Sequence, residues 1–374
     1  MRRPLRRTIV LVRMRRLGYT PALDGLRGVA IGFVLFAHVF GLVNGAIGVE
    51  IFFVLSGFLI TALLVNEWDA NGTIALTAFY RRRALRLLPA LLAGLAVFLV
   101  LSLVTFALGD AHGNRSLSNA VESALFGATY VANIAGAWHG WAAPGLVHLW
   151  SLATEEQFYL LWPVALAFLL RRRASRRWIA VGLLVVLAAI ALHRLQLSLA
   201  GANPRRLYMA PDTSFDAIVT GCALGLAWTS GLLPSALLSR RFTRRAYQPA
   251  LAIIFVCLAA TSWRDRHLYD GLLVAVELSA AVLLLTALCD PGAALTRLLS
   301  RPGLVYVGRI SYGLYVWHLI LMWTMPYGAL PGAALTFPVA ALSYRYLELP
   351  FLRRKQRAEE PSAAGVPLPA PAPA

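Results

Sequence analysis

The sequence predicts an all-α protein, a bundle of about ten helices that cross a membrane. Of its 374 residues, 59% are hydrophobic and only 14% are charged, whereas about a quarter are charged in a typical soluble domain. The apolar residues form long runs, and most runs can cross about 30 Å of hydrocarbon as a helix. This pattern indicates a polytopic helical bundle and excludes a closed barrel, whose strands would be short and alternating.

The predicted spans are joined by mostly short connections. They cover residues 22–43, 47–66, 88–108, 148–169, 178–197, 212–230, 247–263, 271–289, 304–325 and 329–347. In the longest connection, 109–147, an apolar stretch at 122–138 is too interrupted for a span, which favours a re-entrant or interfacial segment. The predicted organisation is a basic N-terminus (1–21), a membrane domain (22–350) and a basic, then Pro/Ala-rich tail (351–374) that we expect to be disordered.

The net charge of +18 comes from arginine clusters at both chain ends and in every second connection. The positive-inside rule therefore places both termini in the cytoplasm and makes the lipid bilayer, not nucleic acid, the expected partner. We expect the first span to be retained, because no small-residue cleavage site follows it. The predicted location is the cytoplasmic membrane of a bacterium, and no oligomeric state is predicted. The clusters lie at 2–16, 81–86, 171–177, 240–245, 297–301 and 353–357.

Arg27 and His38 lie eleven positions apart in the first span, so both side chains share one face of the helix. They are separated by roughly 16 Å along the axis. Ionisable side chains are costly inside a bilayer, which makes this pair a functional-site hypothesis. His38 lies near the outer end of its span, and Glu50 lies at a similar depth in the next one. A carboxylate facing the imidazole would raise its basicity.

Other polar side chains separate by depth into an outer and an inner group. The outer group implies a polar cavity, whereas the arginines of the inner group can clamp phosphates. Cations inside and a candidate base outside fit a reaction whose donor and acceptor are on opposite sides of the membrane. The outer group is His148, Trp150, Ser151, Glu155, Asp216 and His318, and the inner group is Arg27, Arg81, Arg82, Arg83, Arg86 and Arg309.

Simpler explanations exist for several of these residues. Any one arginine of a cluster can serve as a membrane anchor. Ser56 is interpreted as a helix-packing residue beside Gly57, because no base lies within one turn. The three cysteines have neither a CxxC spacing nor nearby histidines, so they indicate small core residues, and no metal site is predicted.

Six ordered blocks between about residue 19 and residue 355 carry a resemblance to the acyltransferase-3 family of integral membrane O-acyltransferases. The blocks are YTPALDGLRGVAIGFVLFAHV, GAIGVEIFFVLSGFLIT, FYRRRALRLLPAL, HLWSLATEEQFYLLWP, ISYGLYVWHLI and ALSYRYLELPFLRRK. The resemblance implies transfer of an acyl group, commonly acetyl from acetyl-CoA, to a hydroxyl of a glycan or of a glycosylated or polyketide small molecule. It places the family motifs on Arg27, His38, Glu50, Arg83, Arg86, Trp150, Ser151, Glu155, Ser311, Tyr312, Tyr315 and His318.

The chain departs from the family pattern in three ways. Relatives often have an arginine in a DTRxD-like segment, whereas residues 212–216 read Asp-Thr-Ser-Phe-Asp, with Ser214 at that position. The connection between His318 and Glu348 is shorter than in many relatives. The sequence lacks the SGNH hydrolase-like domain of some relatives, so we expect the bundle to complete the transfer.

The sequence thus predicts an O-acetyltransferase that uses acetyl-CoA or another acyl-CoA as donor, with no metal. His38 acts as the base, oriented by Glu50 or Glu155. The expected acceptor is a glycan first and a macrolide-type antibiotic second. Two other classes remain open: a proton-coupled transporter with a relay of His and Glu side chains, and a non-catalytic binding scaffold. Predicted donor-binding residues are Arg27, Arg83 and Arg86, and predicted acceptor-binding residues are Trp150, Ser151, Asp216 and His318.

Overall fold

The computed structural model describes residues 18–41, 44–108, 117–140, 144–324 and 329–350. The basic segment 1–17 and the tail 351–374 lie outside these ranges. The described chain is helical and contains no strand, which confirms the all-α fold class.

The helices follow the predicted order, with several additional short segments. They are α2 (Pro21–Phe40), α3 (Ala46–Asn71), α4 (Leu76–Ala107), α5 (Leu117–Ala128), α6 (Ala132–His139), η1 (Pro144–Leu146), α7 (Leu149–Arg171), α8 (Arg176–Leu199), α9 (Pro204–Met209), α10 (Pro211–Ser214), α11 (Asp216–Thr229), α12 (Arg240–Ala260), η2 (Arg266–Leu268), α13 (Leu272–Cys289), α14 (Ala294–Leu299), α15 (Pro302–Arg309), α16 (Ser311–Thr324), α17 (Ala329–Ser343) and the π-helical turn η3 (Tyr344–Glu348).

Five of the described helices are long and apolar enough to cross a membrane: α2, α3, α4, α8 and α13. Helices α15 and α16 make a sixth if the pair, bent by 67°, counts as one span. The chain is therefore a multi-pass membrane protein, but length and composition support fewer crossings than the predicted ten. The other predicted spans fall on helices that are short, such as α11 with 14 residues, or that carry charges, such as α12 with its N-terminal arginines.

The predicted non-spanning stretch in the long connection forms α5 and α6, of 12 and 8 residues, which are too short to cross the hydrocarbon. In contrast, α4 is longer than predicted. It begins at Leu76 and includes the arginines at 81–86, which were expected to precede the span. These arginines therefore project from a continuous helix whose later turns line the core.

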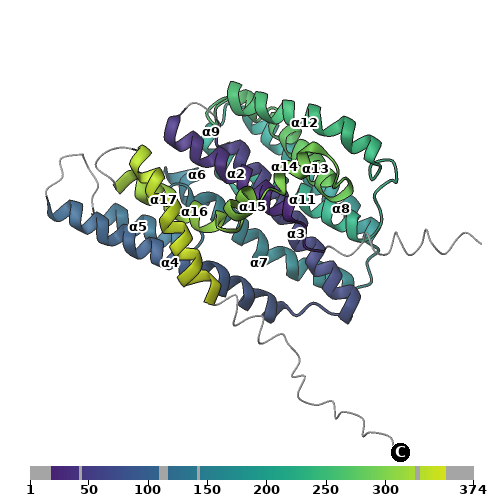
Figure 1. Cartoon of the computed structure of the whole chain (residues 1–374), viewed down its shortest axis with the longest axis horizontal. Coiled ribbons are helices and arrows are strands. Elements are labelled where there is room, and N and C mark those ends of the chain that lie inside the picture. The colour runs from purple at the N-terminus through teal and green to yellow at the C-terminus, as the bar shows by residue number, and fades with distance from the viewer. Residues whose placement is uncertain (1–17, 42–43, 109–116, 141–143, 325–328, 351–374) are drawn as a thin grey trace, which may run out of the picture.

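Helices α2 and α3 run through the middle of the bundle, with α12 and α13 on one side and α4 and α17 on the other (Figure 1). Helix α2 starts after Thr20 with Pro21 in its first turn and ends at Gly41, whose φ of 64° is left-handed. Helix α3 packs closely on α11, because a Cβ added at Gly57 would lie 2.0 Å from the carbonyl oxygen of Ile218. The predicted packing role of Gly57 is thus confirmed.

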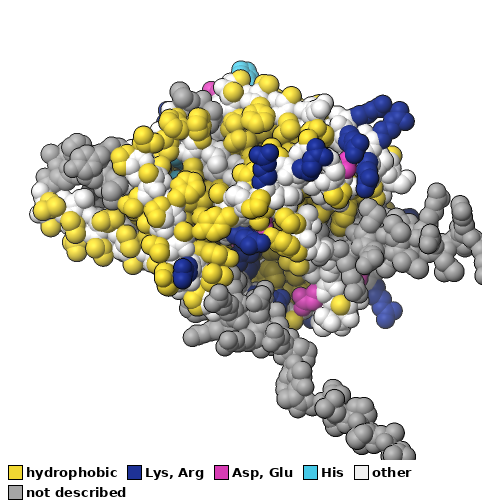
Figure 2. Space-filling model, in the orientation of Figure 1, with side chains coloured by type: hydrophobic (Ala, Val, Ile, Leu, Met, Phe, Trp, Pro, Cys, Tyr) yellow, Lys and Arg dark blue, Asp and Glu magenta, His cyan; other side chains and the backbone are white. Residues whose placement is uncertain are grey.

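The outer surface of the bundle is apolar. Leu92, Val100 and Leu103 of α4 and Leu184 and Val185 of α8 are exposed. Figure 2 shows hydrophobic side chains over most of the visible face, with Lys and Arg densest toward the right of the view. An apolar exterior of this extent is what a lipid-facing surface requires.

Candidate active site

A cavity of about 340 Å³, here called the arginine cavity, lies between α2, α3, α4, α7 and α16. The break between α15 and α16 turns Ser311, Tyr312 and Tyr315 toward it. Its polar lining residues are Arg27, Ser56, Arg83, Arg86, Ser151, Glu155, Tyr159, Ser311, Tyr312 and Tyr315, and its apolar lining residues include Phe52, Phe53, Leu59, Ile60 and Leu63.

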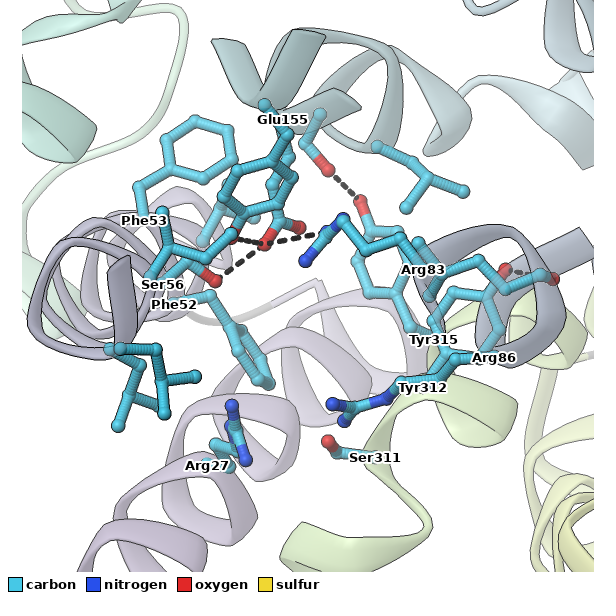
Figure 3. Close-up of a pocket in the computed structure, with 18 residues that line it drawn as sticks. Arg27, Phe52, Phe53, Ser56, Arg83, Arg86, Glu155, Ser311, Tyr312 and Tyr315 are labelled. Carbon is cyan, nitrogen blue, oxygen red and sulfur yellow. Dashed lines mark hydrogen bonds and ion pairs between the residues drawn. The ribbon is translucent and has the colours of Figure 1, made fainter. Parts of the chain in front are cut away.

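Arg27 and Arg86 point toward one end of the arginine cavity, beside Ser311 (Figure 3). Among the described residues, Arg27 contacts a single carboxylate, with its Nη1 3.3 Å from Oδ1 of Asp24. Arg86 makes no ion pair with any described residue. Two neighbouring guanidinium groups with so little neutralising charge form a binding place for an anion.

Arg83 differs from these two arginines, because carboxylates already surround it. Its Nη2 and Nε lie 2.6 and 3.2 Å from Oε1 of Glu156, and Nη2 lies 3.9 Å from Glu155. The guanidinium also stacks over Tyr159, 3.4 Å from the ring centroid. Arg83 thus lines the cavity as predicted, but it is a neutralised wall residue and not a free cation.

Glu155 lies in the arginine cavity and not beside His38. Its Oε1 accepts hydrogen bonds from Ser56 Oγ and from the hydroxyl of Tyr159, the latter at 2.6 Å. Figure 3 shows these contacts across the cavity from Arg27. The expectation that Glu155 orients His38 is therefore wrong. Ser56, which was interpreted as a packing residue, lines the cavity and donates to Glu155, whereas its neighbour Gly57 packs on α11.

A second cavity, here called the histidine cavity, has a volume of about 280 Å³. His38 is exposed to it, and Val49 and Tyr315 line both cavities. Since Arg27 lines one cavity and His38 the other from the same continuous helix, the predicted common face of α2 is confirmed. The lining residues with chemical groups of interest are His38, His148, Trp150, Tyr208, Ser262, Trp263 and Tyr315.

The hydrogen bonding of His38 defines which ring nitrogen is basic. Its Nδ1 lies 2.8 Å from the carbonyl oxygen of Val34. A carbonyl only accepts, so Nδ1 carries the proton of the neutral imidazole and Nε2 carries the lone pair. No described contact joins His38 to Glu50, so the expected imidazole–carboxylate pair is absent from the described residues. The backbone of α2 itself orients the ring.

Three histidines gather beside the histidine cavity: His38 of α2, His318 of α16 and His148 in the turn before α7. The ring centroid of His318 lies 5.0 Å from that of His38 and 4.8 Å from that of His148. His318 donates from Nδ1 to the carbonyl of Tyr315 at 2.6 Å, and His148 donates from Nε2 to that of Val316 at 3.2 Å. His318 is fully buried and lines neither cavity, so it lies behind His38, whereas we expected it to line the acceptor site. Within the described ranges, no three His, Cys, Asp or Glu side chains are arranged to hold a metal ion.

Glu50 and Asp216 belong to a separate buried charge cluster. Arg194 of α8 forms an ion pair with Asp216, and its Nη2 lies 3.8 Å from Glu277. Asp216 and Arg194 also exert the strongest side-chain electrostatic effects on Glu50. Neither Glu50 nor Asp216 lines either cavity. The structure therefore does not place Glu50 beside His38 or Asp216 in an acceptor site, as we expected from the sequence.

Arg194 also contacts residues 212–216, the segment that departs from the family pattern. Its Nη1 donates to the carbonyl of Thr213 at 3.0 Å, in addition to the ion pair with Asp216. A cation from α8 thus reaches the segment in which Ser214 replaces the arginine of relatives. Sequence reasoning missed Arg194, because a charged residue near the end of an apolar run resembles a boundary residue.

Neighbouring residues of α7 line different cavities. Trp150 faces the histidine cavity, where its ring centroid lies 4.3 Å from that of Tyr208, which in turn stacks at 6.1 Å on Trp263. Ser151 faces the arginine cavity, and its Oγ lies 2.5 Å from the hydroxyl of Tyr315. Trp150 therefore lies in the same cavity as His38, as we expected for the outer group, whereas Ser151 lies in the cavity of the arginines. Tyr208 and Trp263 were not predicted, since no motif marked them.

Comparison with known proteins gives one family. A model described as "Acyltransferase domain" matches residues 20–344. The peptidoglycan O-acetyltransferase OatA of Listeria monocytogenes serovar 1/2a is 33% identical over 89% of the chain and 56% of its own length. The O-acetyltransferase OatA of Staphylococcus aureus is 30% identical over 90% of the chain and 58% of its own length.

The chain thus spans little more than half the length of these relatives. No solved structure matches it. The family match covers most of the chain and includes the helices that form both cavities. The chain belongs to the acyltransferase-3 family.

Proposed function

We propose that this protein is a membrane O-acetyltransferase that moves an acetyl group from acyl-CoA to a hydroxyl of a glycan. The observation that carries the proposal is the pair of adjoining cavities, one lined by Arg27 and Arg86, which have little neutralising charge around them, and the other by a basic imidazole nitrogen. Both relatives are named O-acetyltransferases, which supports the same reaction class. The positive-inside rule makes the arginine cavity the cytoplasmic one.

The donor occupies the arginine cavity. Arg27 and Arg86 bind phosphates of the CoA moiety through charge-assisted hydrogen bonds. The apolar side chains of Phe52, Phe53 and Leu59 suit the pantetheine arm, which carries the thioester toward Tyr315.

His38 acts as general base from the histidine cavity. Its Nε2 takes the proton of the acceptor hydroxyl while that oxygen attacks the thioester carbonyl carbon. The tetrahedral intermediate then expels the CoA thiolate, which receives the proton from the imidazolium, so acetylated acceptor and free CoA leave. The hydroxyl of Ser151 lies beside Tyr315, where the two cavities adjoin, and can turn its proton from the Tyr315 oxygen to the oxyanion.

A glycan is the acceptor that the histidine cavity suits best. The rings of Trp150, Tyr208 and Trp263 form a row of flat apolar surfaces on which the C–H face of a pyranose ring can stack. A site of this kind, with many aromatic groups and a few polar ones, orients a ligand through shape and sparse hydrogen bonds. The peptidoglycan backbone is the glycan that the name of the Listeria relative favours.

The test is acetyl-CoA turnover by the protein in nanodiscs with peptidoglycan fragments as acceptor. Wild type is compared with His38→Ala and with the control His267→Ala, which removes a histidine that is 92% exposed and lies in neither cavity. We expect acceptor-dependent release of CoA and an acetylated fragment by mass spectrometry, retained in the control and lost in His38→Ala.

Two results would contradict the proposal. Equal turnover by His38→Ala and wild type would remove His38 from the chemistry. Absence of CoA release from the wild type, together with proton or solute movement into liposomes, would replace the transferase with a transporter.

A further inference from the structure

Val49 of α3 and Tyr315 of α16 are the two residues that the described linings of the arginine and histidine cavities have in common. All other lining residues belong to one cavity or the other. Val49 is buried, and Tyr315 is half-buried. The two side chains therefore form the wall at which the cavities adjoin.

Hydrogen bonds hold the Tyr315 side of this wall in place. The phenol donates to the carbonyl oxygen of His148 at 2.7 Å and lies 2.5 Å from Ser151 Oγ. These contacts connect α16 to the start of α7, and the same ring packs against His148 with centroids 5.3 Å apart. Moving the ring breaks both hydrogen bonds.

The Val49 side of the wall is stiff for a different reason. A β-branched side chain in a helix has one strongly preferred rotamer. Helix α3 also packs closely on α11, where a Cβ added at Gly57 would lie 2.0 Å from the carbonyl oxygen of Ile218, so a rotation of α3 about its axis would disturb that contact. The wall thus has one rigid aliphatic face and one anchored aromatic face.

We propose that Val49 and Tyr315 form the acyl subsite of the enzyme and restrict the transferred group to acetyl. The inference rests on the proposed function. With CoA in the arginine cavity and the acceptor beside His38 in the histidine cavity, the thioester carbonyl reaches the attacking oxygen only between these two side chains. The methyl of an acetyl group fits there, whereas each further methylene meets the valine methyls or the phenol ring.

The expected strength of selection against longer acyl groups can be given as a ratio of kcat/KM values. One additional methylene in a tight apolar site changes kcat/KM by about 10- to 200-fold. We therefore expect wild type to prefer acetyl-CoA to butyryl-CoA by at least about tenfold. Propionyl-CoA should fall between the two.

The experiment measures kcat/KM for acetyl-, propionyl- and butyryl-CoA with one glycan acceptor. Val49→Ala widens the aliphatic face and should lower the acetyl-to-butyryl ratio about tenfold. Val49→Ile narrows it and should raise the ratio. Tyr315→Phe keeps the ring but releases its hydrogen bonds, so the ratio should fall. The control Val185→Ala changes an exposed valine of α8 outside both cavities and should leave the ratio unchanged.

The outcomes separate the two proposals. Turnover of acetyl-CoA by the variants with the wild-type ratio would overturn the acyl subsite and leave the transferase intact. No CoA release from any acyl-CoA by wild type would overturn the transferase and the subsite with it. The three variants change the packing in different ways, so the comparison can still be made if one of them fails to fold.

Discussion

The imidazole rings of His38 and His318 lie edge to face with their centroids 5.0 Å apart. His38 opens into the histidine cavity, whereas His318 is fully buried behind it and bonded through Nδ1 to its own helix. His318 therefore limits the positions that the His38 ring can adopt. Its place indicates a positioning residue and not a group that meets the acceptor.

We predict that His318→Ala lowers kcat by about 10- to 100-fold, because the ring of His38 loses the surface that holds Nε2 in line with the acceptor. The KM for acyl-CoA should change little, since His318 does not line the arginine cavity. His318→Phe should recover part of kcat by restoring the ring. Steady-state kinetics in nanodiscs provide the measurement. A raised acceptor KM with normal kcat would instead support the acceptor-binding role expected from the sequence.

Arg86→Ala should raise the KM for acyl-CoA by about tenfold or more with a smaller effect on kcat, because a hydrogen bond to a charged group contributes about 1.5–3 kcal/mol. The matched control is Arg81→Ala, which removes an exposed arginine of the same helix that does not line the cavity. Binding of desulfo-CoA by calorimetry gives the same comparison without turnover. Equal affinities of the two variants would place the phosphates elsewhere.

Removal of Arg83 should act mainly on stability, since it separates Glu155 and Glu156 in a partly buried site. Arg83→Ala leaves both carboxylates without their cation, and breaking such a pair can cost up to about 3–5 kcal/mol when it is fully buried. The double variant Arg83→Met/Glu156→Met should unfold at a higher temperature than Arg83→Ala. Thermal unfolding followed by tryptophan fluorescence measures both. Independent effects of the two substitutions would show that the contact contributes little.

The helical bundle was predicted from the sequence with more success than the direction of side chains around a helix axis. The long apolar runs and the eleven-residue spacing of Arg27 and His38 identified the bundle and the face of α2 that the cavities share. Hydropathy does not predict which cavity each of two successive residues faces, because their side chains differ by about 100° in direction around the helix. Trp150 and Ser151 therefore face different cavities, and Val49 lines both while Glu50 faces the buried charge cluster.

Tertiary partners account for the remaining differences. Glu50 and Glu155 were both assigned to His38 because they lie at a suitable predicted depth, but Glu155 lies 3.9 Å from Arg83, and Glu50 is buried and lines neither cavity. A carboxylate removed from water is stabilised best by such a cation. The tautomer of His38 is set by the carbonyl of Val34, and a backbone contact of this kind leaves no mark in the sequence.

Asp216→Asn tests the corrected role of the charge cluster. We predict a lower melting temperature with unchanged KM for acyl-CoA and glycan, because Asp216 contacts Arg194 and lines neither cavity. Arg194→Ala should be more severe, since it leaves Asp216 and Glu277 buried without their cation. Fluorescence-detected melting and kinetics are measured on the same preparations. A raised glycan KM at unchanged melting temperature would return Asp216 to the acceptor site.

Trp263→Ala should raise the KM for the glycan acceptor about fivefold to tenfold, because an aromatic contact contributes about 0.5–1.5 kcal/mol beyond its buried area. The KM for acyl-CoA should stay the same, since Trp263 lines only the histidine cavity. Trp263→Phe should lie between the two, and Trp178→Ala, at an exposed tryptophan of α8, serves as the control. An unchanged glycan KM in Trp263→Ala would mean that the sugar does not stack on this ring, and Trp150 and Tyr208 would then have to hold it alone.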